Sequence, residues 1–443
     1  MKQLQSLYLN QRLFISASII IFFFLLAYLF PVFFIIGQIS LIVVGSLVIL
    51  DLVLLYGLNR GVRGTRLCAK RFSNGDENKI QIILENDYPL MVTLNTIDEI
   101  PVQFQRRDIN FVALLKPRET KILEYYLKPV KRGVYDFGLI RVFVSTQIGL
   151  VKRRFDCDRP VSIYVFPSYL QLQKYELLAI SNNLTELGIK KIRKIGHNIE
   201  FEHIKEYVDG DDYRTINWKA TARKNDLMVN LYQDEKSQNV YSLIDKGRMM
   251  QMPFKGMSLL DYAINSSLVL SNVAIKKDDK AGIMTFEKDF DGFLPASRRK
   301  NQMHLILNFL YNQSTTFGET DFSKLYVQLN HHIKRRSLLL LYTNFESIHS
   351  LDRQLPYFQK LARSHLLVVI FFENTELESL VNKDPKDILG IYQKVIAEQF
   401  VYEKTQIVKT LHRYGIQAIL TKPQDLSVSV INKYIELKAR QLI

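Results

Sequence analysis

Two long apolar stretches near the N-terminus predict a pair of membrane-spanning helices. No residue from 13 to 30 is charged, and Asp51 is the only charged residue from 32 to 58. Pro31 and Gly37 break the pattern between the two stretches. A helix of about 20 apolar residues crosses the roughly 30 Å hydrocarbon core, where lipid offers no water to a non-helical backbone. The pattern therefore predicts a transmembrane helix hairpin over residues 1–60.

Asp51 admits two interpretations. An ionisable group inside a spanning helix costs free energy and often marks a functional site. Alternatively, the second span ends near residue 50, which leaves Asp51 close to the lipid headgroups and beside basic neighbours. We favour the second interpretation because the ends of membrane spans are only loosely fixed by sequence.

Short apolar or alternating runs between turn residues follow the hairpin and show no helical period. Runs of this length and spacing predict a β-sandwich over residues 61–170, without a cluster of catalytic side chains. The runs are residues 79–84, 91–94, 111–115, 121–127, 140–144 and 161–166.

From residue 237 to 443 buried-strand patterns alternate with helical patterns, which predicts an α/β domain with a mostly parallel sheet. Such sheets place ligand sites at the carboxyl ends of their strands, here at Asp245, Glu287 and Thr343–Asn344. No glycine-rich phosphate loop opens any of the helices, which argues against a nucleotide-binding active site. The expected strands are residues 240–244, 282–286, 337–342, 366–372 and 417–420, and the expected helices are residues 257–275, 300–311, 321–333, 353–363, 391–411 and 426–442.

The distribution of charge predicts the orientation of the hairpin in the membrane and disfavours nucleic acid as a partner. Basic residues lie before and after the hairpin, at Lys2, Arg12 and several positions from 60 to 71, whereas the connection between the two apolar stretches has none. The positive-inside rule then places both ends, and the domains that follow, on the cytoplasmic face of the inner membrane. No small-residue cleavage site follows the first stretch, so a secretory signal peptide is disfavoured. The formal charge of +15 is dispersed, which favours anionic lipid or an acidic partner over nucleic acid.

The two cysteines, Cys68 and Cys157, are far apart in the chain and do not have the spacing of metal ligands. They predict neither a disulfide framework nor a zinc site, and they are consistent with a reducing compartment.

The most informative segment is the block of residues 210–223, which lies in an expected linker over residues 171–236. Its glycine permits a tight turn, its carboxylates accept backbone or guanidinium hydrogen bonds, and its arginines supply planar donors. Such a cluster is more often a structural lock than a reaction centre, and no nucleophile and base accompany it. The candidate partner-binding or structural residues are Gly210, Asp211, Asp212, Arg214, Asn217, Trp218, Lys219 and Arg223.

This block closely resembles the Gly-Asp-Asp-x-Arg-x-Ile-Asn-Trp-Lys-Ala-Thr-Ala-Arg pattern of the bacterial family called domain of unknown function 58, DUF58. Residues 132–135, Arg-Gly-Val-Tyr, also match a turn in the β-sandwich of that family. The resemblance implies a two-helix anchor, a β-sandwich and a domain similar to von Willebrand factor A. It further implies an adaptor, not an enzyme, that works with MoxR-type AAA+ ATPases in the assembly or maturation of other complexes.

Domains similar to von Willebrand factor A often bind magnesium through an Asp-x-Ser-x-Ser turn, a Thr and a later Asp, and hard oxygen ligands suit that ion. Here Asp245 holds the first position, but Gly247 and Met249 replace the two serines. Thr320 matches the threonine, and Asn344 replaces the late aspartate. Asp245, Thr320 and Asn344 are therefore weak metal candidates, and we expect no cofactor.

The sequence thus predicts a membrane-anchored, cytoplasmic protein-interaction module. Two alternatives stay open at this point. One is a metal-dependent hydrolase that uses Asp211, Asp212 and His203, and the other is a metal-dependent adhesion module that faces outside.

Overall fold

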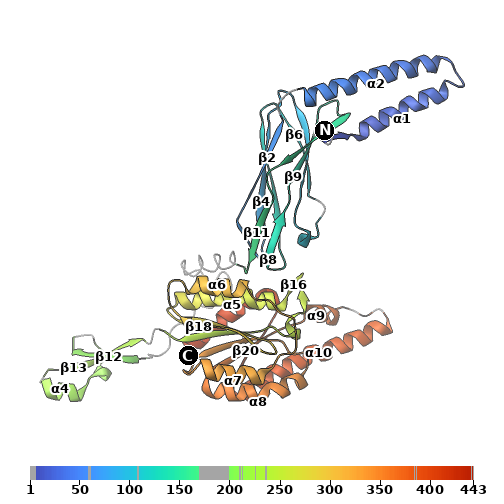
Figure 1. Cartoon of the computed structure of the whole chain (residues 1–443). Coiled ribbons are helices and arrows are strands. Elements are labelled where there is room, and N and C mark those ends of the chain that lie inside the picture. Colours follow the sequence, from blue (N-terminus) through green and yellow to red (C-terminus); the bar gives the residue numbers. More distant parts are fainter. Residues whose placement is uncertain are drawn as a thin grey trace. The chain divides into compact units, whose positions relative to one another are not determined.

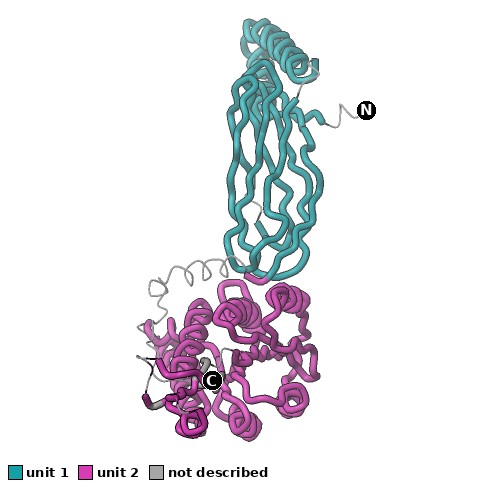
Figure 2. The backbone as a smooth tube through the Cα atoms, turned by 90° about the vertical axis from the view of Figure 1, so that its left-hand side faces the viewer, with its two compact units in different colours: residues 1–166 teal, residues 167–443 magenta. Residues whose placement is uncertain are grey.

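The structure, a computed structural model, describes residues 6–57, 61–106, 109–168, 199–208, 211, 213–224, 226–234, 237–383, 385, 387–440 and 442. The chain divides into two compact units, residues 1–166 and residues 167–443 (Figure 2). The first unit joins two helices to a set of β-sheets, and the second is built around one mixed sheet with helices on both faces (Figure 1).

One helix of the first unit is long and apolar enough to cross a membrane. This helix, α2, covers Val32–Tyr56, which is 25 residues. Helix α1, Gln11–Leu26, is also apolar but has only 16 residues. The two helices lie side by side, and the ring of Phe23 stacks on that of Phe33 with 6.3 Å between centroids. Helix α2 therefore supports a membrane anchor, whereas a second span stays a prediction.

The last turns of α2 pack against β10, Val151–Cys157, and Asp51 makes the central contact. Its carboxylate is fully buried and accepts hydrogen bonds from the backbone amides of Leu150 and Val151, both at 2.9 Å. The hydroxyl of Thr146 donates to the other oxygen. The hydrogen-bond partners of Asp51 are thus two backbone amides and a hydroxyl of the β-rich part, and its position relative to the headgroups stays a prediction.

The remainder of the first unit is rich in β-strands, as the sequence predicted. Strands alternate buried and exposed positions, and Ile80, Ile82 and Leu84 of one strand are all fully buried in a shared core. One sheet has the order β1 (Leu7–Leu9), β10, β9 (Ile140–Ser145), β5 (Val92–Asp98) and β6 (Asn110–Leu115). A second sheet has the order β2 (Val62–Cys68), β4 (Asn78–Asn86) and β7 (Thr120–Leu127). A third has the order β3 (Arg71–Ser73), β11 (Val161–Phe166) and β8 (Gly133–Phe137).

The second unit contains a six-stranded sheet in which only the edge strand β18 is antiparallel to its neighbour. The α/β character and the mostly parallel sheet are as expected, but the sequence pattern missed β18. The strand order is β18 (Phe290–Ser297), β17 (Lys280–Phe286), β14 (Asn239–Asp245), β19 (Leu338–Tyr342), β20 (Leu366–Phe372) and β21 (Gln417–Thr421).

Helices cover both faces of this sheet and so bury its strands on both sides (Figure 1). Helices α5 (Leu259–Lys276), α6 (Gln302–Tyr311) and α11 (Leu426–Ala439) pack on one face, and α7 (Phe322–His332), α8 (Ile348–Ser364) and α10 (Ile388–Arg413) pack on the other. The strand order reverses between β14 and β19, and open α/β sheets bind ligands at the carboxyl ends of strands at such a point. Asp245 and Thr343 lie there.

The expected linker contains a folded element. Strands β12 (Ile199–Glu206) and β13 (Met228–Asp234) form an antiparallel hairpin. The turn η4 (Tyr213–Thr215) and the short helix α4 (Trp218–Lys224) lie between them in the chain.

Candidate functional site

The block of residues 210–223 occupies the connection between β12 and β13. Gly210, Asp212 and the side chains of Arg214 and His203 lie outside the described residues, so the structure does not test the roles expected of them. Asp211, Asn217, Trp218, Lys219 and Arg223 are described, and they fall into two groups.

The polar members of the block hold the connection together. Asp211 accepts hydrogen bonds from Lys205 Nζ at 2.9 Å and from the backbone amide of Val208 at 3.0 Å. The bond from Lys205 is the main reason why the pKa of Asp211 lies below its ordinary value. Asp211 thus pairs with the ammonium of Lys205.

Asn217 caps α4 and links it to β13. Its side-chain oxygen accepts a hydrogen bond from the amide of Ala220 at 3.0 Å, which satisfies one of the free donors at the start of a helix. Its amide nitrogen donates to Asn230 at 2.8 Å. Thr221 accepts a further bond from the backbone of Met228 at 3.0 Å. These contacts give Asp211, Asn217 and Thr221 structural roles within the connection.

The large side chains of the same block face solvent. Trp218, the only tryptophan of the chain, is 69% exposed, and Tyr213 is 68% exposed. Lys219 and Arg223, one helical turn apart on α4, are exposed as well. We refer to Tyr213, Trp218, Lys219 and Arg223 as the aromatic–basic surface.

The second candidate site is the carboxyl edge of the sheet, where Asp245 is almost completely buried. One carboxylate oxygen accepts from Thr320 Oγ1 at 2.7 Å and from the amide of Gly247 at 2.8 Å. The other accepts from Thr343 Oγ1 at 2.7 Å. Burial raises the pKa of Asp245 although these three bonds oppose the shift.

The surroundings of Asp245 differ from those of the expected metal-binding turn. A side-chain carbon added at Gly247 would lie 1.9 Å from Thr320 Oγ1, so the serine of a metal-binding turn has no room there. Of the three metal candidates, Asp245 and Thr320 contact each other, whereas Asn344 accepts a bond from Lys404 Nζ at 2.7 Å. Within the described ranges no three His, Cys, Asp or Glu side chains gather as metal ligands do.

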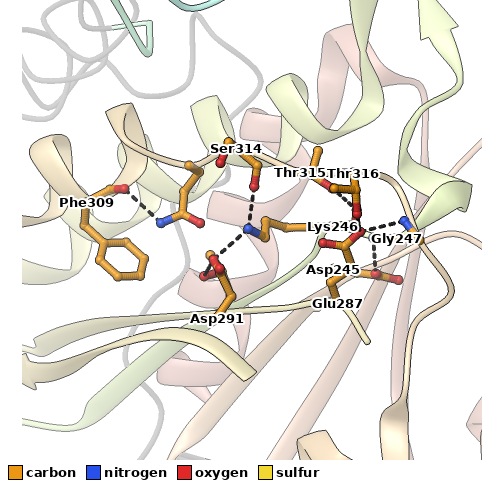
Figure 3. Close-up of polar contacts among 12 residues, drawn as sticks. Asp245, Lys246, Gly247, Glu287, Asp291, Phe309, Ser314, Thr315 and Thr316 are labelled. Atoms are coloured by element: carbon orange, nitrogen blue, oxygen red, sulfur yellow. Dashed lines mark hydrogen bonds and ion pairs between the residues drawn. The ribbon is translucent and has the colours of Figure 1, made fainter. Parts of the chain in front are cut away.

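Hydrogen bonds and ion pairs extend from Asp245 along this edge (Figure 3). Lys246 is only 2% exposed, and its Nζ lies 2.6 Å from both Asp291 and the carbonyl oxygen of Ser314. Glu287 accepts from the amide of Gly318 at 2.6 Å and from Thr316 Oγ1 at 2.7 Å. Partial burial raises the pKa of Glu287, but these bonds outweigh it and hold the pKa below its ordinary value.

Sequence reasoning missed two lysines at this edge, Lys246 and Lys404. The signal for Lys404 was present, because it lies seven residues after Ala397 and three before Ile407, both buried on the same face of α10. Lysine at a core position of an amphipathic helix indicates a buried amine. Lys246 directly follows the buried strand β14. Its burial depends on contacts with Asp291 and Ser314, which lie far from it in the sequence.

Comparison with known proteins identifies proteins that are similar to parts of the chain. Residues 203–378 match the model of the family described as Protein of unknown function DUF58. The uncharacterised protein YeaD of Bacillus subtilis (strain 168) is 24% identical over 131 residues, which is 29% of this chain and 32% of YeaD. The chain therefore matches about a third of the length of this relative.

Solved structures similar to part of the chain include the CARDB domain of the PF1109 protein of Pyrococcus furiosus, with 12% identity and a TM-score of 0.17 over 24% of this chain and 93% of that one. A PapD-like domain of human CEP192 has 14% identity and a TM-score of 0.18 over 24% of this chain and 87% of that one. These scores are too low to support any functional inference. The match of residues 203–378, less than half of the chain, and the match to YeaD show similarity to the DUF58 family.

Proposed function

We propose that the chain is a membrane-anchored adaptor that binds a partner protein through the aromatic–basic surface and has no catalytic role. The observation that carries the proposal is the division of the block of residues 210–223. Its small polar side chains are bound inside the connection, whereas Trp218 and Tyr213 face solvent beside Lys219 and Arg223.

Exposed tryptophan favours a binding role for physical reasons. An indole buries a large apolar area when it enters a pocket, and tryptophan, tyrosine and arginine are enriched among residues that dominate binding energy. Lys219 and Arg223 add positive charge, which favours a partner with an acidic surface and speeds association. The resemblance to DUF58 suggests a MoxR-type AAA+ ATPase as this partner, working with the chain on the assembly or maturation of other complexes.

The test is binding of the purified full-length protein to the purified MoxR-type ATPase of the same organism. We expect Trp218→Ala to cost about 2 kcal/mol of binding free energy, roughly a 30-fold weaker Kd. Arg223→Glu should weaken binding further and reduce its dependence on salt. Tyr414→Ala is the matched control, because Tyr414 is an exposed aromatic of the same unit outside the block. Unchanged binding of both block variants, with normal folding, would refute the proposal.

We also propose that the second unit is a domain similar to von Willebrand factor A that works without metal. The strand order with an antiparallel edge strand, and the position of Asp245 after the first strand of the sheet, support the likeness. Thr320, Thr343 and Gly247 already satisfy the Asp245 carboxylate, which supports the absence of magnesium.

For the anchor we propose two spans with the folded units in the cytoplasm. Both α1 and α2 expose apolar side chains along most of their length, which supports a lipid environment for the pair. Tyr28, in the short connection, is 94% exposed, and Val102, in the β-rich part, is 88% exposed. An impermeant thiol reagent should label Tyr28→Cys in cells stripped of their outer envelope and label Val102→Cys only after lysis. The reverse pattern would overturn the orientation.

A further inference from the structure

A cavity of about 330 Å³ opens at the carboxyl edge of the six-stranded sheet, where β19 and β20 end. Its walls are mainly apolar and come from β20, the helix α9 (Thr375–Val381), α10 and the loop after β14. Cavities of this size and lining are typical of sites for small organic ligands, and this edge is where open α/β sheets bind them. The apolar wall residues are Met252, Phe372, Leu377, Phe400 and Val401.

Lys404 places a positive charge against these apolar walls. Its Nζ donates to the side-chain oxygen of Asn344 at 2.7 Å and to the carbonyl oxygen of Phe345. An ammonium carries three hydrogens, so one donor is left after these two bonds. Burial of the amine lowers the pKa of Lys404 to about 8, a shift that the charge of Glu346 opposes only in part.

Within the described part of the chain Lys404 has no carboxylate in direct contact, although the more distant charge of Glu346 acts on it. Among the residues that the structure describes, none of the ion pairs within 4.0 Å includes Lys404. Glu346 and Glu373 also line the cavity, but Glu346 is exposed and therefore screened by solvent. Partial burial raises the pKa of Glu373, which makes its charge easier to lose beside an incoming anion.

We propose that this cavity binds a small carboxylic acid with an apolar body, which places its carboxylate on Lys404 and its body against Phe372, Leu377 and Phe400. The carboxylate supplies a countercharge in direct contact with Lys404, and a charge-assisted hydrogen bond takes up the remaining donor. An amine of the same shape would meet the Lys404 charge at that position and could only reach the carboxylates at the rim, Glu346 and Glu373. An alcohol or amide would gain the apolar contacts but not the ion pair. The site is separate from the aromatic–basic surface, so it goes beyond adaptor binding.

The test uses the purified full-length protein in detergent micelles and two probes that share an apolar body, 3-phenylpropionate and 3-phenylpropionamide. Isothermal titration or ligand-observed NMR measures binding of each. We expect the acid to bind at least tenfold more tightly than the amide. Lys404→Met keeps the length of the side chain without its charge and should weaken binding of the acid at least tenfold, to the level of the amide.

Two further variants keep the test decisive. Lys409→Met removes an exposed lysine of the same helix and should leave binding of the acid unchanged. Leu377→Trp fills the cavity while Lys404 stays in place, and it should also abolish binding, which covers the case of a Lys404 variant that folds poorly. The proposal is overturned if the wild-type protein binds acid and amide equally, or binds neither, or if folded Lys404→Met or Leu377→Trp binds the acid as the wild type does.

Discussion

The replacement Asp51→Ala tests how the membrane-facing helix α2 is joined to the β-rich part of the first unit. In the wild-type protein the buried carboxylate of Asp51 accepts hydrogen bonds from the backbone amides of Leu150 and Val151 and from the hydroxyl of Thr146. Alanine leaves these three donors without an acceptor. The same strand is anchored a second time, because Arg153 donates to the carbonyl oxygen of Leu55 at 2.5 Å.

The expected magnitude follows from the number of donors. A buried donor that loses its partner costs about 1–3 kcal/mol, and removal of the aspartate also removes the cost of burying its own charge. We therefore expect a net loss of about 3 kcal/mol, a large share of the roughly 5–15 kcal/mol that holds a domain folded. Asp51→Asn keeps one oxygen as an acceptor and should lose about half as much.

The two cysteines provide the assay, since both are free thiols of the first unit. Cys157 is buried at the end of β10, the strand whose first residue contacts Asp51. In a Cys68→Ser background, the rate of labelling of Cys157 in micelles reports how often this strand opens. A loss of about 3 kcal/mol raises that rate roughly a hundredfold when opening is in rapid equilibrium.

Asp156→Asn is the matched control, because Asp156 is an exposed residue of the same strand and pairs only with the neighbouring side chain of Arg154 among its described contacts. Exposed ion pairs of this kind contribute about 0–1 kcal/mol, and the Asp156 charge also raises the pKa of the Cys157 thiol, so labelling should speed up by less than about tenfold, far below the change expected for Asp51→Ala. If Asp51→Ala is labelled as slowly as Asp156→Asn, the buried carboxylate does not hold the helix to the strand.

Three more predictions concern the second unit. Gly247→Ser would place a carbon 1.9 Å from Thr320 Oγ1, so we expect a loss of about 1–3 kcal/mol in thermal or urea unfolding followed by circular dichroism, and a variant as stable as the wild type would contradict the geometry of this turn. Magnesium should leave the unfolding midpoint of the wild type unchanged, whereas an ion bound at 100 times its Kd would add about 2.7 kcal/mol. His365 is buried, and burial lowers its pKa below the ordinary 6.5, so the unfolded state binds the proton more readily and stability should fall as the pH drops below about 6.5, by up to about 1.4 kcal/mol per pH unit. His365→Gln should remove this part of the pH dependence, and equal slopes for wild type and variant would refute the assignment.

Local patterns in the sequence determined the order of the elements. The apolar stretch that forms α2, the alternation in β4 and the buried strands β14, β19 and β20 are all visible in a window of a few residues, because hydrophobic periodicity is a local property. The pattern missed β18, an edge strand whose positions are only partly buried and therefore lack the continuous apolar run of its neighbours.

The candidate sites depended on contacts between distant parts of the chain. The hydrogen-bond donors to Asp51 lie about a hundred positions away in the sequence. Likewise, Asp245 accepts hydrogen bonds from Thr320 and Thr343, which belong to other segments of the chain. A one-dimensional pattern contains hydrophobicity and spacing but not the identity of these partners. The sequence alone thus determined that Trp218 lies in a distinctive block and that Lys404 lies on a helix. Only the tertiary structure decided that the tryptophan faces solvent and that the lysine charge faces a cavity, because burial is a property of the packed chain.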